Sequence, residues 1–184
     1  IPTDLSWKTS SGALVFNSIY TGEHYDARLE QTGWNTPDFD DSKWNGVGYR
    51  AVPSQNVVSQ QVQPIRAVET IPVKIWKKLN DTTYVFDFAR NMAGVTRIKV
   101  SGEEGTVVRL KHGERLYDNG RVNTSNIDVY HRPVDNSDPF QTDILVLSGK
   151  GEDEFMARFN YKGFRYVEVT STNPLVLNEN SLTA

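Results

Sequence analysis

The sequence of 184 residues contains no cysteine, which excludes disulfide bonds, thiol catalysis and zinc sites with thiolate ligands. It also lacks an apolar run near the roughly 20 residues that a bilayer-spanning helix needs, so no membrane partner is expected. The net charge is −3 and no basic stripe is present, so we expect no nucleic-acid partner. A sustained 3.6-residue period of apolar positions is missing as well, which argues against long helices.

The pattern that is present has a period of two, which is typical of half-buried β-strands. It occurs in the segments TTYVFDFA (82–89), VTRIKV (95–100), VVRLKHG (107–113), EFMARFNY (154–161) and FRYVEV (164–169). Among the predicted faces are those formed by Tyr84, Phe86 and Phe88, by Phe155, Ala157, Phe159 and Tyr161, and by Phe164 and Tyr166.

Glycine-rich turns connect these segments, and the whole pattern predicts an all-β, antiparallel β-sandwich or jelly roll. The pair Asn119 and Gly120 suits the two positive φ angles of a type I′ hairpin turn. Only PDFDDSKW (37–44) and TSNIDVY (124–130) have the composition for one or two helical turns.

The chain is long enough for one domain, or one domain with an appended piece, and it changes character at two places. Residues 51–66 are rich in glutamine and serine, contain two prolines and predict an extended connector. Residues 171–184 are polar after Pro174 and predict a tail or a linker. The first residue is Ile rather than Met, so we expect a processed product or a piece cut from a longer protein.

Metal and hydrolytic sites find little support in the spacing of the candidate residues. The three histidines, His24, His112 and His131, stand alone, and no metal site is predicted. DFDDS (38–42) and DNSD (135–138) carry oxygens that suit calcium, although turns and helix caps explain them more simply.

Glu23, Asp26 and Glu114 are the best placed of 23 acids for a glycosidase pair, yet nothing in their spacing selects them. A G-x-S-x-G elbow and a phosphate-binding glycine loop are both absent. We therefore predict no catalytic residue in this chain.

A carbohydrate-binding surface is the sharper hypothesis for the stretch TGEHYDARLEQTGWNTPDFDDSKW (21–44). Sugars stack their C–H faces on exposed aromatic rings and hydrogen-bond to charged groups, and the predicted binding residues are Glu23, Tyr25, Asp26, Arg28 and Trp34. The alternative is structural, because Trp and Tyr usually bury most of their area and Arg28 has acidic neighbours to pair with. For Trp44 the structural alternative is favoured.

An ordered set of motifs adds a resemblance to a known family. GEHYDARLEQTGW, DDSKW, YVFDFARNMAG, LKHGERLYDNGRVNTSNIDVY and ARFNYKGFRYVEVT occur in this order. Together they resemble the accessory β-domain region of bacterial α-L-rhamnosidases, glycoside hydrolase family 78, over about residues 7–170. Each motif is only moderately specific, whereas the ordered set is highly specific.

The resemblance implies a parent enzyme that releases terminal α-L-rhamnose with inversion, using Glu residues in an (α/α)6 barrel that this chain does not contain. Residues 1–53 would be the last strands of the parent's N-terminal β-module, residues 54–170 a concanavalin-like sandwich, and residues 171–184 a tail or linker toward the barrel. The barrel is the implied partner, a rhamnose-containing glycan a further one, and a periplasmic or secreted location is favoured.

Two departures from the family pattern bear on these expectations. The front of the N-terminal module is missing, so the calcium and rhamnose site of some members would be incomplete. We therefore expect no cofactor and keep calcium as an alternative. The family's FDFGQN reads FDFARN here, and alanine at position 89 predicts that no positive φ is needed there.

Two functions thus remain in view. The first is a non-catalytic scaffold for the catalytic barrel, and the second is an autonomous carbohydrate-binding module for rhamnose-containing glycans. Exposure of Tyr25 or Trp34 would favour binding, and burial of both would favour scaffolding. A small self-contained hydrolase is the least supported alternative.

Overall fold

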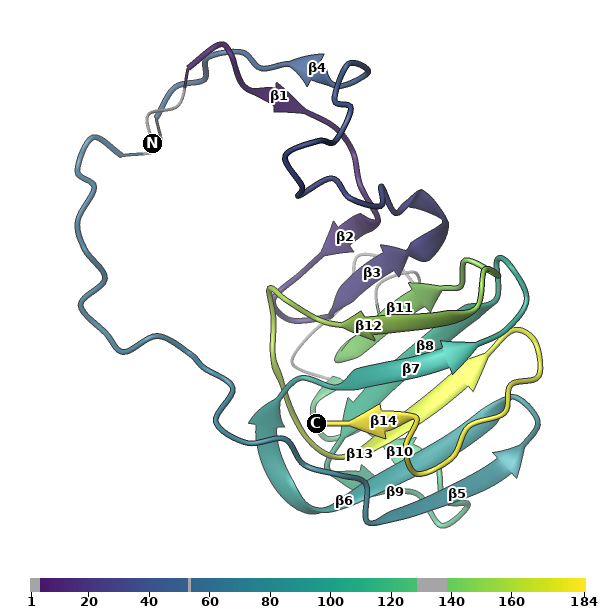
Figure 1. Ribbon diagram of the computed structural model, residues 1–184. Coiled ribbons are helices and arrows are strands. Elements are labelled where there is room, and N and C mark those ends of the chain that lie inside the picture. The colour runs from purple at the N-terminus through teal and green to yellow at the C-terminus, as the bar shows by residue number, and fades with distance from the viewer. Residues whose placement is uncertain (1–3, 53, 129–138) are drawn as a thin grey trace.

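The computed structural model describes residues 4–52, 54–128 and 139–184, which form two β-sheets facing each other (Figure 1). The large sheet has the strand order β2-β3-β11-β8-β13-β6-β5, the small sheet the order β12-β7-β14, and β1-β4 and β10-β9 form short ribbons. The elements are β1 (Lys8–Thr9), β2 (Leu14–Asn17), β3 (Glu23–Asp26), the 3-10 helix η1 (Ala27–Leu29), β4 (Asn45–Gly46), β5 (Ile75–Asn80), β6 (Thr83–Gly94), β7 (Arg97–Ser101), β8 (Val107–Gly113), β9 (Arg115–Leu116), β10 (Val122–Asn123), β11 (Thr142–Val146), β12 (Glu152–Met156), β13 (Lys162–Ser171) and β14 (Leu182–Thr183). The predicted all-β sandwich is confirmed.

One strand pair departs from the antiparallel prediction. β3 runs parallel to β11, with His24 opposite Ile144 and Asp26 opposite Val146, whereas the other pairs between described strands are antiparallel. A parallel pair needs a long connection, and here most of the sandwich lies between the two strands in sequence. The N-terminal strands β2 and β3 therefore complete one edge of the large sheet.

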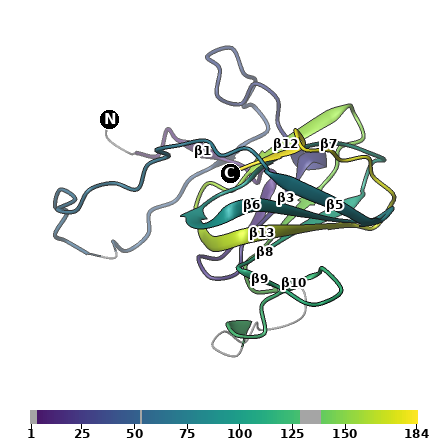
Figure 2. The same ribbon diagram turned by 90° about the horizontal axis from the view of Figure 1, so that it is seen from below.

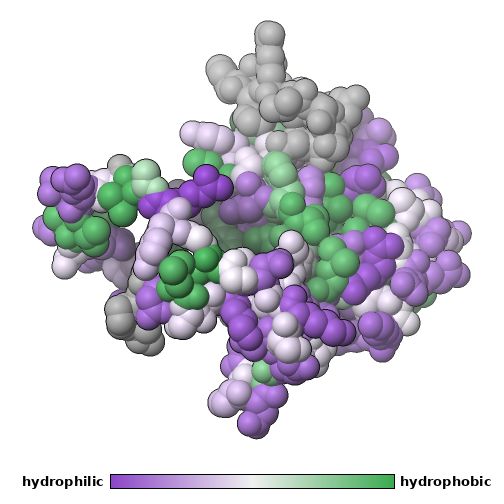
Figure 3. Space-filling view, turned by 90° about the horizontal axis from the view of Figure 1, so that it is seen from above, coloured by the Kyte–Doolittle hydropathy of each residue, from purple (hydrophilic) through white to green (hydrophobic). Residues whose placement is uncertain are grey.

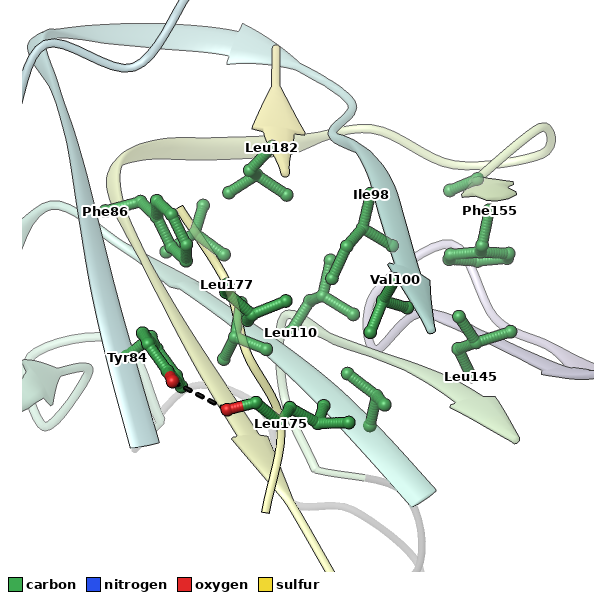
Figure 4. Close-up of a cluster of buried hydrophobic side chains, with 14 of the residues drawn as sticks. Tyr84, Phe86, Ile98, Val100, Leu110, Leu145, Phe155, Leu175, Leu177 and Leu182 are labelled. Carbon is green, nitrogen blue, oxygen red and sulfur yellow. Dashed lines mark hydrogen bonds between the residues drawn. The ribbon is translucent and has the colours of Figure 1, made fainter. Parts of the chain in front are cut away.

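The core lies between the two sheets and is built from the apolar faces that alternation places inward (Figure 4). The large sheet contributes Phe86 and Leu110, the small sheet Ile98 and Leu182, and all four side chains are fully buried. Tyr84 stays in this apolar layer because its hydroxyl donates a 2.7 Å hydrogen bond to the Leu175 carbonyl oxygen.

The predicted faces agree with the structure in part. Tyr84, Phe86 and Phe88 are all buried, as expected from a period of two. In 154–161 the strand ends at Met156. Phe155 and Ala157 are buried, whereas Phe159 and Tyr161, which were expected on the same face, are 59% and 55% exposed. The backbone N–H groups of residues 158 and 159 bind a carboxylate instead of a neighbouring strand.

The prediction that Phe164 and Tyr166 share a face is wrong, because the register of β13 against β6 shifts between them. Phe164 points into the core, and after the shift Val167 and Val169 take over the buried positions. Alternation cannot predict this irregularity, because residues 88–91 of β6 lie opposite the single residue Arg165 of β13.

The prediction of no positive φ at position 89 is also wrong. Ala89 has φ +63°, in the left-handed region. It lies in the irregular part of β6 between Asp87, which is opposite Tyr166, and Met92, which is opposite Phe164. The Ala89 N–H donates to the Asp87 carboxylate at 2.7 Å, and Arg165 binds the same carboxylate with both Nε and Nη2.

The turn at Asn119 and Gly120 forms a hairpin of another type. Gly120 has φ +83°, but the only other described residues with positive φ besides glycine are Ala89 and Gln141, so Asn119 does not fit type I′. The Gly120 N–H donates to the Tyr117 carbonyl, and the Tyr117 N–H to the Arg121 carbonyl. This is a turn in which only the glycine is left-handed, followed by a bulge.

The two segments predicted to hold helical turns differ. Residues 37–44 form turns without a helix. In 124–130, the N–H groups of Ile127 and Asp128 both donate to the Thr124 carbonyl, which closes a single turn, and residues 129 and 130 lie outside the described part of the chain.

The connector prediction is confirmed, and the prediction of a C-terminal tail is not. The connector, predicted at residues 51–66, extends further: residues 54–70 are exposed and carry no regular secondary structure, and they form the long excursion at the left of Figure 1. Residues 171–184 instead belong to the sandwich: Leu175, Leu177 and Leu182 are buried, and β14 pairs with β7. Within residues 4–52, 54–128 and 139–184, no helix is long and apolar enough to cross a membrane.

Candidate functional site

A groove of about 440 Å³ lies between the N-terminal segment and the β12 end of the sandwich. One wall is formed by residues 8–14 and by residues of the 30–44 loop, and the other by β12 with residues 158 and 159. Apolar side chains gather around a hollow in the middle of this face (Figure 3). Of the five predicted sugar-binding residues, Glu23, Tyr25 and Trp34 line the groove, whereas Asp26 and Arg28 do not.

Glu23 lies at the floor of the groove and is 1% exposed. Its Oε1 accepts hydrogen bonds from the backbone N–H groups of Arg158 at 2.8 Å and Phe159 at 2.6 Å, and from the Asn160 side chain at 3.2 Å. All the described hydrogen bonds to this oxygen are thus donated by groups of the protein itself. Glu23 holds the loop after β12 against β3, which is a structural task.

Tyr25 and Trp34 are the two aromatic residues of the predicted set that line the groove, and the 59% exposed Phe159 lines it as well. Tyr25 packs on Phe155 with ring centroids 5.6 Å apart, and its hydroxyl donates to the Glu30 carboxylate. Burial, followed by this hydrogen bond, raises the pKa of Tyr25 to about 12, so the hydroxyl stays protonated and can donate at neutral pH. Trp34 is 52% exposed, which leaves much of the indole open to a ligand.

Asp26 and Arg28 pair with each other away from the groove. Asp26 caps η1 by accepting from the Arg28 N–H at 3.0 Å, and its two oxygens accept from Arg28 Nε at 2.9 Å and Nη2 at 2.7 Å. These hydrogen bonds hold the pKa of Asp26 below its usual value and raise that of Arg28. Helix capping accounts for both side chains.

Two other residues of the loop shape the groove: Gln31, which the sequence analysis did not single out, and Trp44, for which it favoured a structural role. Gln31 donates to the Ser11 carbonyl at 2.7 Å and accepts from Trp44 Nε1 at 2.9 Å. Trp44 also packs on Phe39, with ring centroids 5.6 Å apart. These contacts join the 30–44 loop to residues 8–14 and fold it into a wall of the groove, and for the part that Gln31 takes the sequence carries no local signal.

Comparison with known proteins decides the family of this sandwich and its N-terminal strands. The family model described as the bacterial alpha-L-rhamnosidase concanavalin-like domain matches residues 77–184, and the alpha-L-rhamnosidase N-terminal domain matches residues 1–69. The chain belongs to the bacterial α-L-rhamnosidase family. The recognition made from the ordered motifs is therefore confirmed.

The curated relatives that the chain matches are named α-L-rhamnosidase. The chain is 38% identical to an α-L-rhamnosidase of Streptomyces avermitilis over 89% of its own length and 15% of the relative's. It is 31% identical to one of Formosa agariphila over 94% of its length and 18% of the relative's. The chain thus spans less than a fifth of the length of these two α-L-rhamnosidases.

Solved structures of α-L-rhamnosidases contain the same fold. The enzyme from Dictyoglumus thermophilum superposes with a TM-score of 0.87 and 37% identity, over the whole of this chain and 20% of that one. The Streptomyces avermitilis enzyme, whose crystal structure is a complex with L-rhamnose, superposes with a TM-score of 0.85 and 35% identity, over the whole of this chain and 17% of that enzyme's chain. The fold of this chain therefore recurs as a β-domain region of these larger rhamnosidases.

The described part of this rhamnosidase region contains no group of three or more His, Asp or Glu residues that could hold a metal ion. In DFDDS, Asp40 accepts from the Ser42 N–H at 3.0 Å and Asp41 pairs with Lys8 at 2.6 Å. A turn and an ion pair thus use these carboxylates. DNSD (135–138) and His131 lie outside the described residues.

The acids of the groove all have partners. Besides Glu23, they are Glu30, bound to Tyr25, and Glu154, which lies 3.5 Å from Arg97 and 3.4 Å from Lys99. Inverting glycosidases need one acid to protonate the leaving group and a second to activate water. The contacts of these three carboxylates serve folding, and none of them marks an acid and base pair.

Proposed function

We propose that this region is the non-catalytic scaffold of an α-L-rhamnosidase whose catalytic (α/α)6 barrel lies elsewhere in the polypeptide. The observation that carries the proposal is that the complete fold recurs as a fifth or less of larger α-L-rhamnosidase chains. A rigid sandwich fixes the loops at the mouth of a neighbouring domain and so shapes the entry of a rhamnoside.

The connector supplies a surface for contact with the rest of the polypeptide. Val57, Ile65 and Val68 in this segment are 94%, 82% and 95% exposed, and they stand clear of the sandwich. Apolar side chains gathered on one exposed segment are typical of surfaces that a further domain covers. The connector would then lie against the catalytic barrel.

The test uses the full-length protein and an aryl rhamnoside as substrate. We expect Val57→Ser combined with Val68→Ser to lower the melting temperature of the catalytic domain by a few degrees. Val176→Ser is the matched control, because Val176 is 90% exposed but lies outside the connector. If the isolated 184-residue chain released product from the aryl rhamnoside, the scaffold assignment would be wrong.

The groove favours a second candidate function, an autonomous module that binds rhamnose-containing glycans. The supporting observation is the half-exposed Trp34 on the wall of the groove that Tyr25 also lines. Titration with rhamnose should then saturate and weaken in Trp34→Ala. Trp7→Ala is the control, since Trp7 is 46% exposed and lies outside the groove. A flat titration, with calcium and with chelator, would eliminate this function.

A further inference from the structure

The outer face of the large sheet carries three cations, Lys77, Arg109 and Lys111, to which neither the structural contacts nor the proposed function assigns a role. Alternation turns Val108 and Leu110 of β8 into the core, so Arg109 and Lys111 point outward. In the lateral row through Lys111, β13 contributes Glu168, β6 contributes Val85 and β5 contributes Lys77.

The β9–β10 hairpin covers part of this face, on the side of the sheet opposite the small sheet (Figure 2). Gly113 of β8 permits the close approach, because a Cβ there would lie 2.6 Å from Val122 of the hairpin. Arg121 binds both oxygens of the buried Glu168, at 2.9 and 2.6 Å, and the Val122 N–H donates to the same carboxylate. These contacts fix the hairpin as a wall on the sheet.

A hollow of about 260 Å³ opens between this wall and the sheet, and it is lined by Lys111, Tyr117, Asn119, Arg121, Val122 and Glu168. Tyr117 is 47% exposed, so its ring is available for stacking. Glu114, Arg115 and Asp118 of the hairpin do not line the hollow, and neither do Lys77 and Arg109 of the sheet, which lie on the face beside it.

The charges on this face do not balance. Glu168 is neutralised by Arg121, while no ion pair within the described residues involves Lys77, Arg109 or Lys111. Arg109 and Lys111 are two residues apart on one strand, so their Cα atoms are about 7 Å apart. Arg109 and Lys111 on β8, with Lys77 three strands away on β5, leave positive charge without an ion pair on this face, and such charge attracts anions.

We propose that this face, beside the β9–β10 hairpin, binds the anionic groups of a glycan, carboxylate or sulfate. The cations would pair with the anionic groups, Tyr117 would stack on a sugar ring, and the Asn119 amide would hydrogen-bond to hydroxyls. The assignment to a glycan, rather than to an acidic protein, rests on the proposed function within a rhamnosidase and on this aromatic and amide pair.

The test measures binding of the full-length protein to polygalacturonate, to dextran sulfate and to neutral dextran at low salt. We expect at least one of the two anionic polymers to bind, and we expect no binding of neutral dextran. Added salt should weaken the binding of the anionic polymer. The carboxylate and sulfate arms then identify the anionic group. Absence of binding to both anionic polymers would overturn the proposal.

Variants locate the site. Arg109→Gln combined with Lys111→Gln should weaken binding about tenfold or more. Lys43→Gln combined with Lys150→Gln removes the same charge from exposed positions elsewhere, and its affinity should stay within about twofold of the parent protein. Equal losses in both pairs would show an effect of net charge alone and overturn the site.

Two further arms test the class of ligand and the link to the proposed function. Tyr117→Ala should weaken binding of the anionic glycan but not binding of poly-L-glutamate. If the unmodified protein bound the anionic glycan and poly-L-glutamate with equal affinity, the assignment to a glycan would be overturned. Hydrolysis of a neutral aryl rhamnoside should be unchanged by the Arg109 and Lys111 substitutions. If the full-length protein hydrolysed the rhamnoside but bound neither anionic polymer, only this inference would be refuted. If the unmodified full-length protein did not hydrolyse rhamnosides at all, the proposed function would be refuted.

Discussion

Ala89 provides the sharpest test of how local strain is held in this sandwich. Its φ of +63° places the methyl group close to the following carbonyl oxygen, which costs an L-residue other than glycine about 1–2 kcal/mol. The strain persists because its neighbours define the conformation: Asp87 accepts the Ala89 N–H and is itself held by two hydrogen bonds from Arg165. We therefore expect Ala89→Gly to stabilise the protein.

The magnitude follows from two opposing contributions. Glycine removes the strain of about 1–2 kcal/mol but gains more freedom in the unfolded chain, which costs about 0.5–1 kcal/mol. Ala89 is exposed, so little apolar burial is lost with the methyl group. The expected net gain is about 0.5–1 kcal/mol in the free energy of unfolding, measured by urea denaturation.

A matched control lies in the same strand. Ala93 is also exposed and is not among the residues with positive φ, so Ala93→Gly adds only the unfolded-state freedom and should destabilise by about 0.5–1 kcal/mol. The two alanine-to-glycine substitutions should thus have opposite signs. If Ala89→Gly lowered the free energy of unfolding as Ala93→Gly does, the assignment of strain at Ala89 would be refuted.

Three further outcomes follow from buried groups. Leu182→Ala should cost about 2–5 kcal/mol in denaturant unfolding because Leu182 is fully buried, while Leu5→Ala, at a 57% exposed position, should cost little. Glu23→Ala leaves two backbone donors without their acceptor and should cost about 3 kcal/mol, with Glu23→Gln less harmful because it keeps an oxygen. Burial lowers the pKa of His112 to about 4 from 6.5, so the unfolded chain takes up the proton first. Stability should then fall as pH drops from 6.5 toward 4, by about 3 kcal/mol, and a melting series should lose this slope in His112→Gln.

Much of the fold could be predicted from alternation, because the inward faces of β7 and of β8 as far as His112 repeat at a period of two. The failures have a common physical cause in contacts between distant residues. The strand ends at Met156 since a carboxylate more than 130 positions earlier binds the next backbone N–H groups. Leu175 and Leu182 lie in a polar stretch without periodicity, and only the small sheet and the core reveal their burial.

The predicted sugar-binding residues are brought together only in part. Tyr25 and Trp34, the aromatic residues of that set, both line the groove. Glu23, Asp26 and Arg28 carry groups typical of a sugar site, yet Glu23 holds a loop and the other two pair with each other. The type of a side chain indicates what it can bind, whereas its nearest partners decide how much of that capacity is left for a ligand.

The two sides of the groove should differ in local stability, because different kinds of contact hold them. β3 is fixed from beneath: the Glu23 N–H donates to the Asp143 carboxylate, Lys162 binds the same carboxylate at 2.7 Å, and the chain at Gly22 approaches Thr142 so closely that a Cβ would lie 2.1 Å from its carbonyl oxygen.

The 30–44 loop is held by exposed hydrogen bonds, such as those of Gln31, and by the exposed pair of Lys8 and Asp41. Hydrogen exchange should therefore proceed by local opening in the loop and only by global unfolding in β3, with a clear difference in protection between them. Equal protection in both segments would mean that the loop forms one cooperative unit with the sandwich, and its wall of the groove would then be as rigid as the β3 floor.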